Sequence, residues 1–180
     1  DGRVLPVISN VIVTKKLNED ELDAHKFKTF SPIANTKNLL YYYRKLPDNR
    51  ILFGTRGDLT GSDQSNLAMS IKMEKFLKDI FPKWSNVSID YNWRGLIALS
   101  QKLTPSIGKI DNEEIYYGFG YNGVGVSAAP WTGKQLSKLV FSSNSKELDI
   151  STIYKGLPKK FIFPPLRTFY LKLAVWFYAI

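Results

Sequence analysis

The chain has 180 residues, of which 44% are hydrophobic and 23% charged, and this composition is typical of a folded protein. The absence of cysteine excludes disulfides, thiolate metal sites and cysteine nucleophiles, and it agrees with a reducing, cytoplasmic location. The net charge of +9 comes from scattered lysines rather than a basic run, which indicates a solvated surface, and we expect no nucleic-acid partner.

The single histidine, His25, lies in a polar run from 18 to 26, where a solvated side chain is expected. A Ser/His/Asp triad would have to use this residue, and a zinc site would lack a second nitrogen or sulfur ligand. The sequence therefore predicts no metal site, and it identifies no catalytic residue.

The first half of the chain predicts two strand regions and one helix. β-branched residues from Val7 to Thr14 indicate a strand that ends before a polar, acidic loop. Residues 39–54 indicate a hairpin, because Pro47-Asp48-Asn49 carries turn chemistry between two aromatic or β-branched runs. Apolar residues at helical spacing predict a helix over 63–80, which stops at Phe81-Pro82.

The second half continues with two strands and two helices. Residues 87–99 alternate in polarity, which predicts a strand with one buried face carrying Tyr91 and Trp93. A strand at 115–119 precedes a helix over 124–141, which Ser142 to Ser145 should end. The apolar tail from 166 to 180 predicts a docked terminal helix, because a bilayer span needs about 20 apolar residues.

A glycine cluster stands out between the last strand and the helix that follows it, within residues 116–129. Glycine lets the backbone turn tightly and approach a ligand closely, and a helix N-terminus adds free N–H donors and a positive dipole end. An electron-rich group is expected there. A turn that needs its glycines only for packing explains the spacing equally well.

Residues 91–108 and the glycine cluster together resemble the FAD-dependent oxidoreductases of the D-amino-acid-oxidase superfamily. They show the pattern W-x-G, then P-x-I-G, then G-[FY]-x-G-x-G, in that order. The hairpin ending at Gly54 and the helix stop at Phe81-Pro82 also look like this family, so the resemblance covers roughly the whole chain. Within the superfamily the nearest likeness is to the gamma-glutamylputrescine oxidase type.

The resemblance implies an α+β fold in two parts. Residues 1–97 would form part of the substrate domain, a mainly antiparallel sheet with packed helices. Residues 98–180 would supply the C-terminal strands and helix of an FAD-binding domain, together with the terminal helix. The dinucleotide fingerprint G-x-G-x-x-G does not occur in this chain, so the Rossmann half is missing.

The missing half is the first expected partner, on the same polypeptide or on another chain. Without it nothing would hold the adenine and pyrophosphate, so we expect the isolated chain to bind FAD poorly and to be inactive. The surface that normally packs on the missing half would be exposed, and apolar patches of this kind favour self-association.

The resemblance also implies site residues. It places Asn122, Gly123, Val124 and Gly125 beside the pyrimidine edge of the flavin, mainly through their backbone. It places Pro105, Ile107 and Gly108 on a strand that lines the ring, with simple strand packing as the alternative.

One position departs from the family pattern. An arginine that grips the substrate carboxylate falls two residues after the W-x-G glycine in several branches, and Ile97 stands there. Isoleucine cannot pair with a carboxylate, so a small amine or longer amino compound is the expected substrate. Tyr43 and Trp93 are candidates to line that pocket with Ile97, although an aromatic strand also suits a core. Arg94 is expected at the surface.

These points predict the C-terminal fragment of a flavin oxidoreductase that oxidises an amine or amino compound to an imine. Two other interpretations stay open from the residues. The chain could be a basic binding module without flavin, whose binding to an acidic partner would depend strongly on salt. It could equally be a degenerate homologue that keeps the fold as a scaffold.

Overall fold

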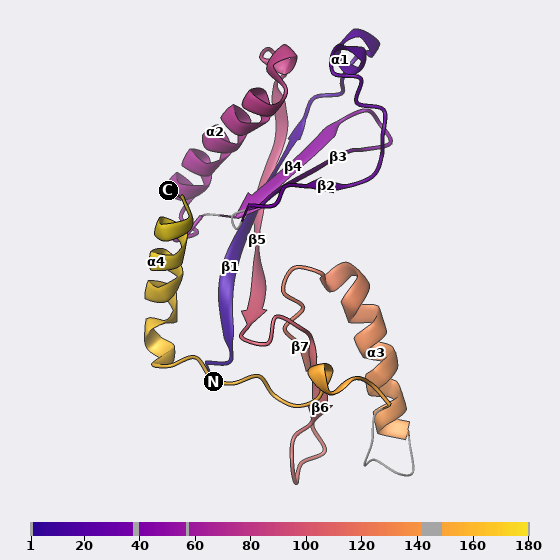
Figure 1. The fold of residues 1–180 in the computed structure, drawn as a ribbon, viewed down its shortest axis with the longest axis vertical. Helices are drawn as coiled ribbons and strands as arrows, with labels where there is room; N and C mark the ends of the chain where they lie inside the picture. Colours follow the sequence, from indigo (N-terminus) through magenta and orange to yellow (C-terminus); the bar gives the residue numbers. More distant parts are fainter. Residues whose placement is uncertain (1, 38–39, 57, 142–148, 180) are drawn as a thin grey trace. The chain divides into compact units, whose positions relative to one another are not determined.

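The computed structural model describes residues 2–37, 40–56, 58–141 and 149–179, and it has an α+β fold (Figure 1). The predicted fold class is confirmed, with one five-stranded antiparallel sheet, a separate two-stranded sheet and helices. The chain divides into two compact units. The sheet unit comprises Ile8–Leu96 with Lys172–Ile180, and the hairpin unit comprises Asp1–Val7 with Ile97–Leu171. Their assignment as substrate-domain and FAD-domain parts stays a prediction.

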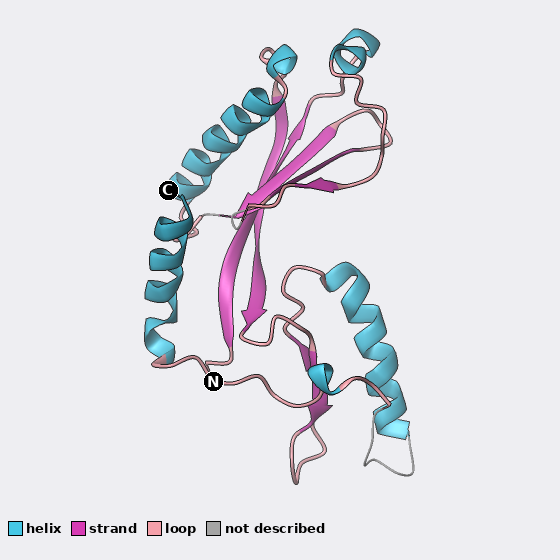
Figure 2. Ribbon diagram, in the orientation of Figure 1, coloured by secondary structure: helices cyan, strands magenta, loops and turns pink. Residues whose placement is uncertain are grey.

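The large sheet has the strand order β2-β3-β4-β1-β5, and Figure 2 shows its strands in magenta. The strands are β1 (Val4–Thr14), β2 (Ile33–Ala34), β3 (Tyr41–Lys45), β4 (Ile51–Arg56) and β5 (Ile89–Ser100). The predicted first strand and hairpin are confirmed, since β3 and β4 pair antiparallel. The amide of Leu46 donates to the carbonyl of Arg50 at 2.8 Å, and Asn49 takes the left-handed conformation that such a turn requires.

The predicted helix is also confirmed as α2 (Asp63–Ile80). Ser62 caps it, because its hydroxyl oxygen accepts from the amide of Ser65 at 3.1 Å. The buried stripe of this helix consists of Met69, Met73 and Leu77, spaced four residues apart so that they share one face. Phe76 is partly buried against the same core, whereas Leu67, Ile71 and Ile80 are exposed, so only part of the predicted stripe contributes to the core.

The core of the sheet unit joins this helix stripe to aromatic side chains from the strands and from the turn after α2. Its largest fully buried members are Trp84 and Phe53, and Phe81 packs on Trp84 with ring centroids 4.4 Å apart. The short helix η1 (Pro82–Trp84) brings Trp84 into this core, where its indole N–H donates to the carbonyl of Glu21 at 2.6 Å. The hydrogen bond satisfies the one polar group of a buried indole.

A helix replaces part of the loop predicted after the first strand. α1 (Glu19–Ala24) begins with a complete capping box: the Asn18 side-chain oxygen accepts from the Glu21 amide, and the Glu21 carboxylate accepts from the Asn18 amide. The signal Asn-x-x-Glu is present in the sequence, but the acidic run obscured it. The prediction of a loop was therefore wrong at this point.

The buried face predicted for the strand at 87–99 is also wrong. The strand exists as β5, yet Tyr91 is 57% exposed and Trp93 is 46% exposed. Alternating polarity identifies an apolar face, but burial requires a second element packed on it. In the sheet order β5 lies at an edge, and the Tyr91 ring instead lies 5.2 Å from the Arg50 guanidinium.

The hairpin unit contains β6 (Ser106–Lys109) and β7 (Tyr116–Phe119), paired antiparallel, followed by α3 (Gly125–Phe141). The predicted strand and helix are confirmed, and the helix stop predicted at 142–145 lies outside the described residues. Ile107 and Leu139 are buried where α3 covers the hairpin. A terminal helix is present as α4 (Arg167–Ala179), but its docking stays a prediction, since Phe169 and Trp176 are more than half exposed. No helix in the described ranges is long and apolar enough to cross a membrane.

His25 is not the solvated side chain that the polar run predicted. Its Nε2 accepts a hydrogen bond from the amide of Lys83 at 3.0 Å, and its ring meets Phe81 and Trp84 edge to face at 5.3 and 5.1 Å. An accepting Nε2 requires a neutral ring with its proton on Nδ1. Burial, followed by the nearby Lys83 charge, lowers the pKa of His25.

We expect the free energy of unfolding to fall as pH drops from about 7 to 5.5. Below the ordinary histidine pKa of about 6.5, the unfolded state binds the proton while the folded state resists it, so acid favours unfolding. Urea titrations at several pH values should show this slope, and His25→Gln should flatten it. His25 is the only histidine, so an equal slope in the variant would contradict the assignment.

Candidate functional site

The glycine cluster forms a tight loop between β7 and α3. Gly120, Asn122 and Gly123 have φ angles of 76°, 54° and 97°, so three of four consecutive residues are left-handed. Glycine adopts this conformation at little cost, and asparagine tolerates it better than most residues. The loop therefore needs these residue types for its own geometry, before any ligand is considered.

Asn122 joins this loop to the end of β5. Its side-chain oxygen accepts from the amide of Ser100 at 2.8 Å, and its own amide donates to the carbonyl of Ala98 at 3.3 Å. Its side-chain nitrogen donates to the carbonyl of Gly120. The sequence predicted a backbone role at this position and missed these side-chain bonds, which mark Asn122 as the residue that positions the loop.

The first turn of α3 leaves backbone donors free. The residue before the helix, Val124, has no side-chain oxygen and cannot cap it. The amide of Val124 bonds back to Tyr121 at 2.9 Å, whereas we find no acceptor among the described residues for the amides of Gly125 and Val126. Val126 is 98% exposed. Free amides at the positive end of a helix dipole favour an electron-rich group.

The residues predicted on the returning strand have a structural role of their own. Pro105 is buried just before β6, and Ile107 is 1% exposed with its side chain in the core. A Cβ on Gly108 would lie 2.4 Å from the Tyr117 hydroxyl, so glycine is required for this close contact. Packing explains all three residues, and any contact of β6 with a ring would use its backbone.

The structure brings the glycine loop and the start of β6 together. Ser106 pairs with Phe119, the residue before Gly120. A Cβ built on Gly120 would lie 3.9 Å from the carbonyl oxygen of Thr104. Gly108 lies two residues after Ser106 on β6, which corresponds to about 7 Å along the strand. Both predicted groups of cofactor-binding residues therefore belong to one region of the hairpin unit.

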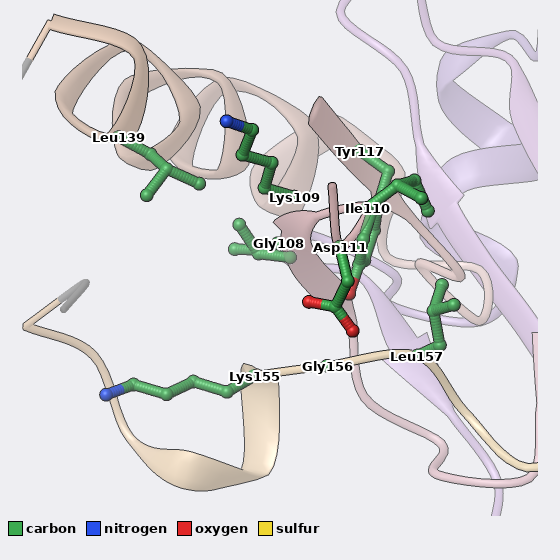
Figure 3. Close-up of a pocket in the computed structure, with 10 residues that line it drawn as sticks. Gly108, Lys109, Ile110, Asp111, Tyr117, Leu139, Lys155, Gly156 and Leu157 are labelled. Carbon is green, nitrogen blue, oxygen red and sulfur yellow. The ribbon is translucent and has the colours of Figure 1, made fainter. Parts of the chain in front are cut away.

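A cavity of about 490 Å³ lies beside Gly108, and no sequence pattern predicted it. The end of β6, the side chain of Leu139 and the segment 155–157 bound it (Figure 3). Lys109, Asp111 and Lys155 supply charged groups to its lining. Burial raises the pKa of the Tyr117 hydroxyl, which also lines the cavity. Aliphatic side chains, among them Ile110 and Leu157, complete the lining, so the cavity is mixed in character.

The predicted substrate-pocket residues lie in different surroundings. Tyr43 packs in the aromatic core of the sheet unit, stacked on Phe53 and edge to face with Phe81 at 5.4 Å. Trp93 is exposed on β5, and Ile97 is half-buried in the hairpin unit. Their grouping into one pocket stays a prediction. Within the described ranges no group of three or more histidine, aspartate or glutamate side chains could hold a metal ion.

Arg94 was expected at the surface but is half-buried. Its Nη1 donates to the carbonyl of Ser62 at 3.0 Å, and its Nη2 donates to the Asp63 carboxylate at 3.1 Å. It also lines a second cavity, of about 340 Å³, within the sheet unit. Sequence alternation placed Arg94 opposite Trp93 on the strand but could not show that a turn and a helix start lie over it.

Comparison with known proteins identifies the family of the chain. Residues 1–139 match the family described as FAD dependent oxidoreductase, so the chain belongs to the FAD-dependent oxidoreductases of the D-amino-acid-oxidase (DAO) family. The resemblance found in the sequence is thus confirmed.

Two curated relatives show how much of such a protein is present. The chain is 32% identical over 155 residues to a probable oxidoreductase OrdL of Haemophilus influenzae, covering 86% of this chain and 33% of that protein. It is 33% identical over 138 residues to gamma-glutamylputrescine oxidoreductase of Escherichia coli, covering 77% and 32%. The chain therefore spans about a third of the length of these relatives.

Solved structures support the fold alone. Glycine oxidase from Geobacillus kaustophilus superposes with a TM-score of 0.64 at 15% identity, covering 90% of this chain and 40% of that one. Fructosyl peptide oxidase from E. terrenum superposes with a TM-score of 0.65 at 10% identity, covering 93% and 42%.

We expect Asn122→Ala to lower the free energy of unfolding by about 1–3 kcal/mol, because the buried amide of Ser100 loses its acceptor. Asn112→Ala is the matched control: Asn112 is also left-handed, with φ 62°, but it is exposed and its side chain has no hydrogen bond to a described residue. Urea titrations of both variants measure the difference. Equal losses would show that only the left-handed backbone matters.

Proposed function

We propose that this chain is the C-terminal part of an FAD-dependent oxidoreductase that oxidises an amine or amino compound to an imine. The observation that carries the proposal is the uncapped start of α3 beside the glycine loop, in a chain that belongs to this family. A valine in the capping position is a local disadvantage for the helix, because peptide N–H groups are left unpaired. A bound electron-rich group would offset it.

The residues present fit the edge of a flavin. The free amides of Gly125 and Val126 are donors for carbonyl oxygens, and the loop of Asn122 and Gly123 holds them in a fixed position. When bound, FAD would supply the two-electron acceptor for amine oxidation. The contribution of these residues would be to orient the ring and to stabilise the negative charge that reduction places on it.

Two observations bear on the substrate. Ile97 occupies the position at which several branches of the family have an arginine that binds the carboxylate of a simple α-amino acid. An aliphatic side chain does not bind a carboxylate. One relative at 33% identity is named for gamma-glutamylputrescine, an amine with a longer body. We therefore favour an amine or a longer amino compound, and the cysteine-free composition favours a cytoplasmic enzyme.

The remaining two thirds of such a protein would contain the dinucleotide fingerprint and hold the adenine and pyrophosphate. The contact surface that we propose for it on the hairpin unit is apolar and exposed. It comprises Val124 before the first turn of α3, Val126 within that turn, and Phe141, 84% exposed, at the end of the helix. Leaving these side chains in water is unfavourable, which supports docking of the missing part or self-association of the chain alone.

The isolated 180-residue chain is expected to show no amine oxidation. Purified chain with added FAD, a panel of diamines and amino acids, and a reducible dye as acceptor should give no rate above the flavin blank. The longer protein that includes this chain should reduce the dye with at least one of the amines. Turnover by the isolated chain would contradict the proposal that activity requires the remaining part of the protein.

In the longer protein we expect Gly125→Ala to weaken FAD binding about tenfold, or 1.4 kcal/mol, by holding the flavin edge away from the amides. The chain tolerates the new Cβ, which would meet Tyr121 at an ordinary 3.6 Å. Gly133→Ala is the control in the same helix, since its Cβ would meet nothing within 4 Å. Flavin fluorescence titrations measure both affinities, and equal values for the two variants would contradict the proposed contact.

A further inference from the structure

The second cavity lies wholly within the sheet unit and joins three elements. Ile8 of β1, Thr60 and Gly61 of the turn before α2, and Arg94, Gly95 and Leu96 of β5 line its volume of about 340 Å³. The lining combines two aliphatic side chains with one cation and one hydroxyl. A small ligand with an apolar body and an anionic end is the class that this combination suits.

The guanidinium of Arg94 is held in place without losing its charge. Two of its N–H groups bond to the Ser62 carbonyl and the Asp63 carboxylate, and the chain offers no further acceptor for the others among the described residues. The Asp63 side chain is fully exposed, so water screens this ion pair and it neutralises Arg94 only weakly. Arginine has five N–H donors in a planar fork, which leaves donors for a second carboxylate.

The turn that forms another wall is rigid. One oxygen of the buried Asp58 carboxylate accepts from the amides of Thr60 and Gly61 at 3.1 and 3.0 Å and from the Ser65 hydroxyl at 2.6 Å. Burial raises the pKa of Asp58, but these hydrogen bonds outweigh burial and leave the pKa below its ordinary value. The carboxylate therefore stays ionised at neutral pH and keeps the turn in place.

Gly61 completes this wall. Its φ of +68° is left-handed, and a Cβ there would lie 3.1 Å from the Ile8 side chain. Glycine at this position therefore allows the turn to approach β1 closely, so the cavity exists before any ligand binds and little order has to be created on binding.

We propose that this cavity binds the carboxylate of a small aliphatic acid, with Arg94 as its charged partner and Ile8 and Leu96 against its apolar body. Arg94 and Ile97 are three residues apart on β5, so their side chains leave opposite faces of the strand. This cavity is therefore separate from the position at which the family pattern predicts a carboxylate partner. Binding of the acid itself needs no flavin.

Butyrate and butylamine are matched probes, since they have similar aliphatic bodies and opposite charges. We expect butyrate, titrated into the ¹⁵N-labelled 180-residue chain at constant ionic strength, to shift the amide signals of Gly61 and Gly95 in a saturable way. Butylamine and sodium chloride should not shift these signals in a saturable way. Arg94→Gln should raise the Kd for butyrate about tenfold or more, because a charged hydrogen-bond donor is lost.

Arg44→Gln is the matched control, because Arg44 is an exposed arginine of the same unit that does not line the cavity. It should leave the butyrate Kd unchanged. Chemical modification by phenylglyoxal gives a second test on the unaltered chain: butyrate should protect Arg94 and not Arg44. Unsaturable shifts, equal shifts with butylamine, or an unprotected Arg94 would each overturn the proposal. These readouts involve no turnover, so an inactive enzyme would leave the result intact.

Discussion

The hydrogen bonds of Asn122 determine the geometry of the hairpin unit's candidate site. The side-chain oxygen of Asn122 satisfies the buried amide of Ser100, and its own amide meets the carbonyl of Ala98, so the chain leaving β7 is fixed to the end of β5. This contact sets where α3 begins. The direction of the free amides at Gly125 and Val126 follows from it, and so does the proposed contact with a flavin.

Close packing then fixes the helix against the hairpin. A Cβ on Gly118 would lie 2.3 Å from the methyl group of Thr132, so α3 and β7 approach as closely as glycine permits. The buried hydroxyls of Ser100, Ser106 and Thr132 have no hydrogen-bond partner within the described chain.

The sheet unit exposes apolar side chains on its edge strand. Its core around Trp84 and Phe53 is well packed, yet Tyr91 and Trp93 of the edge strand β5 are exposed. Folded proteins rarely leave a long apolar edge strand open. The chain covers about a third of the length of the curated relatives. The cavity at Arg94 is different, since a rigid turn and a paired arginine already shape it.

Local signals in the amino-acid sequence were sufficient for most elements. Period-two and period-3.6 patterns, the Pro47-Asp48-Asn49 turn and the glycine cluster act over a few neighbouring residues, so β1, the β3–β4 hairpin, β5, β7, α2 and α3 were predicted from them alone. The two-residue strand β2 was not predicted, and β6 was expected only from the family resemblance. The glycine loop was recognised for the same reason. Its role as a cofactor site stays a prediction.

Tertiary structure decided what depends on residues distant in the sequence. The bonds from Asn122 to Ser100, the burial of His25 against Trp84, and the position of Arg94 over the α2 start each join segments more than 20 residues apart. No periodicity encodes such pairings. The exposure of Tyr91 and Trp93 was likewise hidden, because an apolar face is a property of a strand whereas its burial is a property of what packs on it.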